Sequence, residues 1–289
     1  GGSKSSMVNI ATIALTIADK MIAHGSNNEI KNRIKKALEI LSRPGVRFSA
    51  NNVIQFFAKQ FVYAENIQNA IKSSKAQKGL YSFDMLGEAA WTMEDAEKYF
   101  LSYKNALIEI GEHRQSENVF EADGISVKLS ALHPKYDFMH RDRVLSELLP
   151  RIIELVHIAQ KYNIGINIDA EEAERLDLSL DVIDQIMSSI ANTSWKGFGV
   201  VVQAYQKRSP YVIDWLHQSC KKHHLKIMVR LVKGAYWDSE IKKAQVMGEV
   251  DYPVFTKKIN TDYSFLVCAQ KLLLLRGYIY PQFASHNAH

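Results

Sequence analysis

The sequence has 289 residues, 47% apolar and 23% charged, which is enough to bury a large core and suits one large α/β domain with an appendage. Its formal net charge is +5, but the cations are spread out and form no basic stripe with stacking aromatic residues, so nucleic acid is not predicted as a partner of this segment. Cys220 and Cys268 form no CxxC or metal spacing, and no apolar run reaches the roughly 18 residues that cross a membrane, which predicts a cytoplasmic chain.

The first residues carry two features that are easily mistaken for structure. Residues 1–6 (GGSKSS) are typical of a scar left by an expression vector. Residues 7–22 are apolar enough to resemble a secretory signal, but Asp19 and Lys20 interrupt the run and no small-x-small cleavage site follows it. An amphipathic helix is therefore the better interpretation of this stretch.

An N-terminal helical region is predicted for residues 7–78. Apolar residues keep helical spacing in it, and the Ser-Arg-Pro-Gly sequence at 42–45 interrupts the pattern. Beyond the first helix, the pattern predicts helices over residues 30–41, 53–64 and 66–77. Lys78 and Gly79 end the helical pattern, so a second domain is predicted over residues 79–289.

In this second part, apolar runs typical of buried strands alternate with helical patterns. The runs predict strands within residues 81–86, 125–132, 164–170, 198–205, 226–234 and 279–287. Helical patterns, such as those of residues 144–162 and 179–191, lie between them. Strand–helix repeats of about 30 to 50 residues are typical of βαβ units and a parallel sheet, either doubly wound or closed into a barrel. Because no GxGxxG fingerprint opens a helix, the sequence favours the closed barrel.

Polar side chains stand near the ends of these strands, among apolar neighbours. They are Asp84, Lys128, Asp169, Gln203, Arg230 with Lys233, and His286. The carboxyl ends of parallel strands meet at one mouth of a barrel, so we expect these side chains to converge there. A single charge would be typical of a core ion pair, but polar ends on successive strands indicate a functional site.

The fifth strand and the residues after it form the most informative segment. Three apolar residues begin a buried strand, and the cations Arg230 and Lys233 follow. Gly234 would let the backbone come close to a ligand. Tyr236 and Trp237 offer flat apolar surface of the kind that a planar cofactor needs.

Several long segments carry a family resemblance. They are YSFDMLGEAAWT (81–92), VKLSALHP (127–134), NIDAEEAERL (167–176), VVQAYQKRSPYVIDW (201–215), VRLVKGAYWDSEIKKAQ (229–245) and YPQFASHNAH (280–289). They resemble the proline dehydrogenase domain of the bacterial proline utilisation A proteins. The resemblance implies an FAD-bearing (β/α)8 TIM-type barrel that oxidises L-proline to Δ1-pyrroline-5-carboxylate by hydride transfer to flavin N5. It also implies a membrane quinone as electron acceptor, a bifunctional parent protein with an aldehyde dehydrogenase domain, and peripheral association of that parent with the inner membrane.

The same resemblance implies roles for individual residues. Arg230 matches an arginine beside flavin N5, where a cation stabilises the negative charge that develops on the flavin. Asp169 is expected to fix Arg230 through a charge-assisted hydrogen bond, and Lys128 to meet the proline carboxylate. Gln203 would donate and accept at the pyrimidine edge of the flavin. The remaining residues implied to contact the cofactor are Lys233, Gly234, Ala235, Tyr236, Trp237, Thr256, Lys258, Thr261, Ser285 and His286.

The sequence departs from the family pattern at its end. It stops at His289, after the sixth predicted strand, so we expect an incomplete barrel of six of the eight strands with two unpaired edges. In the family, the final helix carries paired arginines and a glutamate that hold the substrate. Without them, this chain is expected to be inactive alone.

Two rival functions stay open at this point. Lys128 and Lys233 stand at strand ends, as the Schiff-base lysine of a class I aldolase does. The other rival is a non-catalytic fragment. No metal site is predicted, because His286 and His289 lack a third ligand. Two further motifs are interpreted as structural: the basic run at 221–224 as a solvated turn, and the acidic pair at 171–172 as the start of a helix.

Overall fold

The structure is a computed structural model that describes residues 62–85 and 87–285. The chain divides into two compact units, residues 1–70 and 71–289, and all strands described below belong to the second. The described elements, with the short 3-10 helices labelled η, are α4 (Ile67–Ser74), β1 (Ser82–Asp84), α5 (Met93–Glu112), η1 (Val119–Glu121), β2 (Gly124–Val127), η2 (Leu129–Ala131), η3 (Phe138–His140), α6 (Arg141–Glu147), α7 (Leu149–Tyr162), β3 (Gly165–Ile168), η4 (Ala173–Arg175), α8 (Leu176–Ser189), β4 (Phe198–Gln203), α9 (Ser209–His223), β5 (Ile227–Val232), α10 (Trp237–Met247), α11 (Lys258–Leu274) and β6 (Ile279–Phe283).

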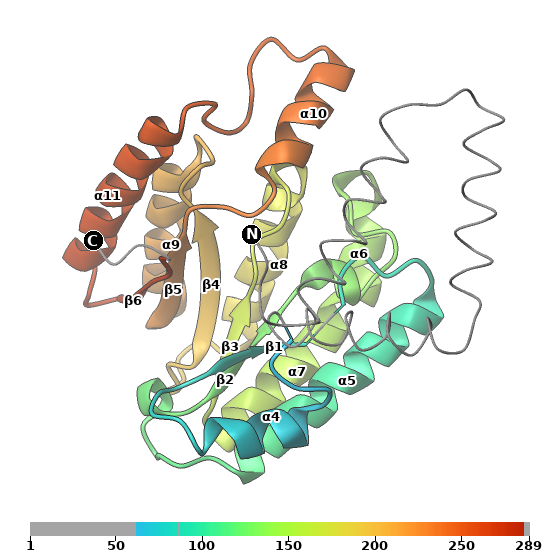
Figure 1. The fold of residues 1–289 in the computed structure, drawn as a ribbon, viewed down its shortest axis with the longest axis vertical. Helices are drawn as coiled ribbons and strands as arrows, with labels where there is room; N and C mark the ends of the chain where they lie inside the picture. Colours follow the sequence, from blue (N-terminus) through green and yellow to red (C-terminus); the bar gives the residue numbers. More distant parts are fainter. Residues whose placement is uncertain (1–61, 86, 286–289) are drawn as a thin grey trace, which may run out of the picture. The chain divides into compact units, whose positions relative to one another are not determined.

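The six strands form one parallel sheet in chain order, β1 to β6 (Figure 1), as the spacing of apolar runs predicts. Every residue of β2 and β3 is buried, including the polar Ser126 and Asn167, so both faces of these strands are covered. The sheet is strongly curved. The guanidinium of Arg230, on β5, reaches the hydroxyls of Ser126 on β2 and Ser82 on β1, so the first and fifth strands face one another across the interior.

The longer helices cover the sheet. The neighbours α5 and α7, α7 and α8, α8 and α9, and α9 and α11 pack side by side, and α5, α7, α9 and α11 also contact strands. Parallel neighbouring strands joined through helices are the βαβ arrangement expected for a barrel wall. It places the loops that follow the strands together at one end of the sheet, where ligands bind in such folds.

Two predicted boundaries differ from the structure. The helix predicted over 144–162 is two helices, α6 and α7, because Pro150 lies in the first turn of α7, where its missing N–H costs no hydrogen bond. The run 221–224, predicted as a solvated turn, forms the last turn of α9 with its left-handed cap at His224; Lys221, Lys222 and His224 are exposed as predicted. His223 is buried and hydrogen bonds to Asp184 at 2.9 Å.

Some predictions fall outside the described residues. These concern residues 1–6, the helices predicted over 7–22 and 30–41, residues 53–61 of the next predicted helix, and the site residue His286; residues 62–64, the predicted end of that helix, are not helical. The helix predicted over 66–77 corresponds to α4. Within the described ranges, no helix has both the length and the apolar character to cross a membrane.

Candidate active site

A cavity of about 800 Å³ lies at the carboxyl ends of the strands. It collects residues from the ends of β2, β3, β4, β5 and β6 and from the start of α11, as the alignment of strand ends predicts. The predicted site residues that line it are Lys128, Asp169, Gln203, Arg230, Lys233, Gly234, Ala235, Tyr236, Lys258 and Ser285. Sequence reasoning missed Ala170, Val201, Val232, Phe283 and Ala284, which also line it. The two-residue period of strands was an available signal, because Val201 lies two residues before Gln203 and Val232 lies two residues after Arg230, on the same faces.

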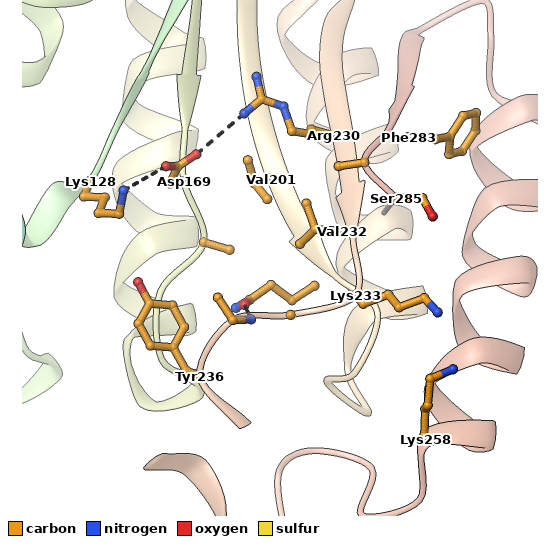
Figure 2. A pocket seen from close by; sticks show the side chains of 15 residues that line it. Lys128, Asp169, Val201, Arg230, Val232, Lys233, Tyr236, Lys258, Phe283 and Ser285 are labelled. Atoms are coloured by element: carbon orange, nitrogen blue, oxygen red, sulfur yellow. Dashed lines mark hydrogen bonds and ion pairs between the residues drawn. The ribbon is translucent and has the colours of Figure 1, made fainter. Parts of the chain in front are cut away.

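A charged cluster occupies one side of this cavity (Figure 2). Lys128 Nζ lies 3.3 Å from Asp169 Oδ2 and 2.9 Å from Asp84 Oδ2. Arg230 Nη1 lies 3.9 Å from Asp169 Oδ1. The side chains of Lys128, Asp169 and Arg230 are each less than one-fifth exposed, so their charges act through a medium of low dielectric constant.

The pKa values in the cluster follow from burial and from these neighbours. Burial raises the pKa of Asp169; Lys128 and Arg230 oppose that shift, and Asp84 adds to it. Burial disfavours the charged form of Lys128, but its hydrogen bond to Asp84 and the field of Asp169 raise its pKa above the ordinary value. Burial lowers the pKa of Arg230, against the fields of both carboxylates. Lys128 therefore stays a cation at neutral pH.

The position of Arg230 is fixed differently from the prediction. Its Nη1 donates to the hydroxyl of Ser126 at 2.9 Å and its Nη2 to the hydroxyl of Ser82 at 2.8 Å. The expected hydrogen bond from Arg230 to Asp169 is wrong, because 3.9 Å is an ion-pair distance beyond hydrogen-bond length. Two serines on the far strands therefore orient the guanidinium, and Asp169 contributes only its field.

Gln203 ties together the loops that follow three strands. Its Nε2 donates to the carbonyl oxygen of Glu171 at 2.9 Å, and its Oε1 accepts from the N–H of Ala235 at 3.1 Å. Glu171 is itself buried, and Glu172 is the N-cap residue of η4, so the acidic pair lies at the start of a helix as predicted. One N–H and one lone pair of the Gln203 amide are left for a ligand.

Gly234 is required for two reasons that involve the protein itself. Its φ is +139°, a conformation that side chains rarely tolerate. A Cβ atom at this position would also lie 2.4 Å from Cδ1 of Tyr205. The hydroxyl of Tyr205 accepts from the N–H of Tyr236 at 3.2 Å, so Tyr205 holds the loop of residues 234–236 in place.

Two lysines mark the opposite side of the cavity. Lys233 and Lys258 both pair with Asp262, the latter at 2.5 Å. These cations hold the pKa of Asp262 below its usual range. Figure 2 shows Lys258 beyond Lys233, away from Lys128 and Tyr236. Two cations against one carboxylate leave a net positive charge at this end.

Three predicted cofactor residues do not line the cavity. Trp237 is the first residue of α10, and its indole N–H donates to the carbonyl oxygen of Phe255 at 2.9 Å. Thr261 is buried within α11, and Thr256 is exposed before that helix. Their contact with a cofactor remains a prediction. Among the described residues, no group of three or more histidine, cysteine or acidic side chains could hold a metal ion.

Comparison with protein families identifies the chain. The family model described as proline dehydrogenase matches residues 67–289. The chain belongs to the proline dehydrogenase family. It is 44% identical to the Bifunctional protein PutA of Escherichia coli over its whole length, and 28% identical over 80% of its length to Proline dehydrogenase 1 of Bacillus subtilis. It spans only 22% of the PutA relatives and 65% of the Bacillus protein.

Solved structures give the same result for the fold. Proline utilization A of Bradyrhizobium japonicum superposes with a TM-score of 0.76 at 46% identity, over 89% of this chain and 26% of that one. Proline utilization A of Bdellovibrio bacteriovorus, inactivated by N-propargylglycine, gives 0.77 at 26% identity, over 98% of this chain and 30% of that one. The prediction of a TIM-type α/β barrel fold, represented here by six strands, is confirmed.

Proposed function

We propose that this chain is the flavin-binding part of an FAD-dependent L-proline dehydrogenase, which oxidises L-proline to Δ1-pyrroline-5-carboxylate. The observation that carries the proposal is the buried cluster of Lys128, Asp169 and Arg230 in a cavity of about 800 Å³ at the strand ends of a proline dehydrogenase family member. A cavity of this volume lies in the range of cofactor and small-molecule sites, which is about 300 to 1,000 Å³.

The residues present fit a flavin dinucleotide. The net positive charge at Lys233 and Lys258 suits the pyrophosphate, and the apolar side chains of Val201 and Val232 suit a flat ring system. Bound FAD would supply the hydride acceptor of the reaction. Arg230, held by two serine hydroxyls, would place a fixed cation near the reacting ring and stabilise negative charge there.

Lys128 would hold the substrate. Its ammonium remains charged at neutral pH because Asp84 and Asp169 raise its pKa, so it can pair with the carboxylate of proline. Both carboxylates already contact Lys128, so the substrate carboxylate would share its cation with them. This arrangement agrees with the expectation that further cations are needed to bind the zwitterion.

The same observations disfavour the Schiff-base aldolase. An imine-forming lysine needs a lowered pKa, so that its amine is free to attack a carbonyl. The pKa of Lys128 is instead raised by its two carboxylate neighbours, and Lys233 is paired with Asp262. Neither lysine is therefore prepared for nucleophilic attack.

The PutA relatives are named bifunctional, and the chain covers about a fifth of their length. We therefore propose a parent protein that carries a second catalytic domain, an aldehyde dehydrogenase, next to this one. Electron transfer to a membrane quinone, with peripheral association of the parent with the inner membrane, belongs to the same proposal.

Absorbance and chemical trapping together test the proposed function. The purified chain is mixed with FAD, passed through a desalting column and scanned for the visible flavin bands. A parallel sample is treated with borohydride and a small carbonyl compound, and its mass is measured. Retained yellow flavin with an unmodified lysine is the expected result, while a reduced imine adduct on Lys128 or Lys233 without bound flavin would favour the aldolase. Escherichia coli PutA serves as the positive control for proline-dependent flavin reduction.

A further inference from the structure

A chain of hydrogen bonds joins the loops that follow five successive strands, β1 to β5, and the side chain of Glu171 lies at its centre. The main-chain N–H of Ser130 donates to Glu171 Oε1 at 3.0 Å. The hydroxyl and carbonyl oxygens of Ser130 accept from the N–H groups of residues 89–90, at 3.0 and 2.9 Å. The carbonyl oxygen of Glu171 accepts from Gln203, which in turn accepts from the N–H of Ala235.

The carboxylate of Glu171 is held firmly. Its side chain is 4% exposed, and Arg175 Nη1 lies 2.7 Å from Oε2. Burial raises its pKa, while the bonds from Ser130 and the charge of Arg175 oppose that shift. A charge is costly to bury unless its partners compensate for lost water, so this carboxylate is stabilised by the contacts that fix it.

Glu171 does not itself line the cavity of about 800 Å³. Its partner Gln203 does, and so do Ala235 and Tyr236, whose loop is tied to Gln203 by the Ala235 N–H. The side chain of Glu171 fixes its own backbone, and the carbonyl of that backbone fixes the amide of Gln203. A change at Glu171 is therefore transmitted to the loop after β5 without a direct contact.

We infer that Glu171 is a positioning residue for the segment Ala235–Tyr236, acting through Gln203, and that it thereby sets the affinity for a bound flavin. The part that concerns flavin rests on the proposed function. The part that concerns the loop rests on the hydrogen bonds alone.

Hydrogen–deuterium exchange of the chain without cofactor tests the connection. Glu171→Ala should speed exchange in the peptide spanning residues 233–237 by about tenfold or more, because a charge-assisted contact is lost. Exchange in the peptide of α7 should stay unchanged. Glu171→Gln keeps an oxygen that accepts from Ser130 and should retain most of the protection.

Glu172→Ala is the matched control. Glu172 has the same charge and also lies near Arg175, at 3.1 Å, but it makes no hydrogen bond to Ser130. It should leave the 233–237 peptide unchanged. If Glu171→Ala does not fold, Arg175→Met, which removes the partner of Glu171 Oε2 together with the cation beside Glu172, should give an intermediate increase. Unchanged exchange at 233–237 in the folded Glu171→Ala or Arg175→Met chain would overturn the inference.

FAD titration of the same variants separates the two claims. The dissociation constant should rise about tenfold in Glu171→Ala and little in Glu171→Gln or Glu172→Ala. If the unchanged chain binds no FAD, the proposed function fails, and the exchange experiment still decides the role of Glu171. If the unchanged chain and Glu171→Ala bind FAD equally well, the inference fails and the proposed function stands.

Discussion

Replacing Lys128 by methionine should destabilise the fold through the carboxylates that it leaves behind. Lys128 Nζ contacts Asp84 at 2.9 Å and Asp169 at 3.3 Å, and Lys128 and Asp169 are only 16% and 18% exposed. Without the ammonium, Asp169 keeps Arg230 at 3.9 Å as its countercharge and is repelled by Asp84. Breaking a fully buried pair costs about 3 to 5 kcal/mol, and since Asp84 is half exposed we expect about 2 to 3 kcal/mol for Lys128→Met near neutral pH.

The destabilisation caused by Lys128→Met should decrease as pH falls below neutral. The raised pKa of Asp169 means that its ionisation lowers stability as pH rises from its unfolded value, near 3.9, through its folded value. Removing Lys128 raises that folded pKa further and widens the window. The raised pKa of Lys128 contributes stability that is complete below about pH 10 and is lost as pH rises through the folded pKa. Below neutral pH, Lys128 is fully charged in both the folded and the unfolded chain, so the pH dependence there comes from Asp169. The destabilisation should therefore shrink towards about pH 4.

Urea denaturation followed by far-UV circular dichroism measures this effect. Lys104→Met is the matched control, because Lys104 pairs with Glu154 at an exposed position, where an ion pair is worth about 0 to 1 kcal/mol. Adding Asp169→Asn to Lys128→Met should restore part of the lost stability. The free energy of unfolding is measured near pH 7 and near pH 4. Equal destabilisation by Lys128→Met at these two pH values, or strictly additive effects in the double variant, would refute the reasoning.

Three further predictions concern the cavity. Gly234→Ala should cost about 1 to 3 kcal/mol in urea denaturation, because φ is +139° and the new Cβ would meet the ring of Tyr205; unchanged stability would contradict this reading of the loop. Arg230→Met should lower the reduction potential of bound FAD and slow its reduction by proline about tenfold to a hundredfold, measured where the protein turns over proline; an unchanged potential would remove Arg230 from the mechanism. Lys258→Met should weaken FAD binding and flatten its dependence on salt, whereas Lys271→Met, whose lysine pairs with Asp214, should not.

The parallel sheet could be predicted because its inner strands, β2 to β5, are almost entirely buried on both faces. Runs such as residues 198–202 stay apolar without alternation, and the spacing of the runs leaves room for one or two helices between strands. The charged strand ends could be predicted for the same reason, since an ion such as Asp169 is rarely placed beside a buried strand without a partner or a function.

The side-chain contacts of the site could not be predicted, because they depend on the curvature and packing of the sheet. The partners of Arg230 are Ser82 and Ser126, far away in sequence, and no local pattern marks a serine as a guanidinium acceptor. Glu171 and Glu172 are adjacent and identical in type, yet Glu171 is buried against Ser130, and only tertiary packing distinguishes the two. Gly234 suggested a close ligand, but the contact that excludes a side chain comes from Tyr205.

Calorimetric titration of the 289-residue chain with FAD tests the central claim most directly. The account predicts noncovalent binding of one FAD per chain, with the flavin released into solution by heat or acid. The binding should weaken when Lys258 is replaced by methionine, because one of the cations at the phosphate end is lost. No binding by a chain that keeps its native circular dichroism spectrum would contradict the account, as would flavin that stays attached to the denatured chain.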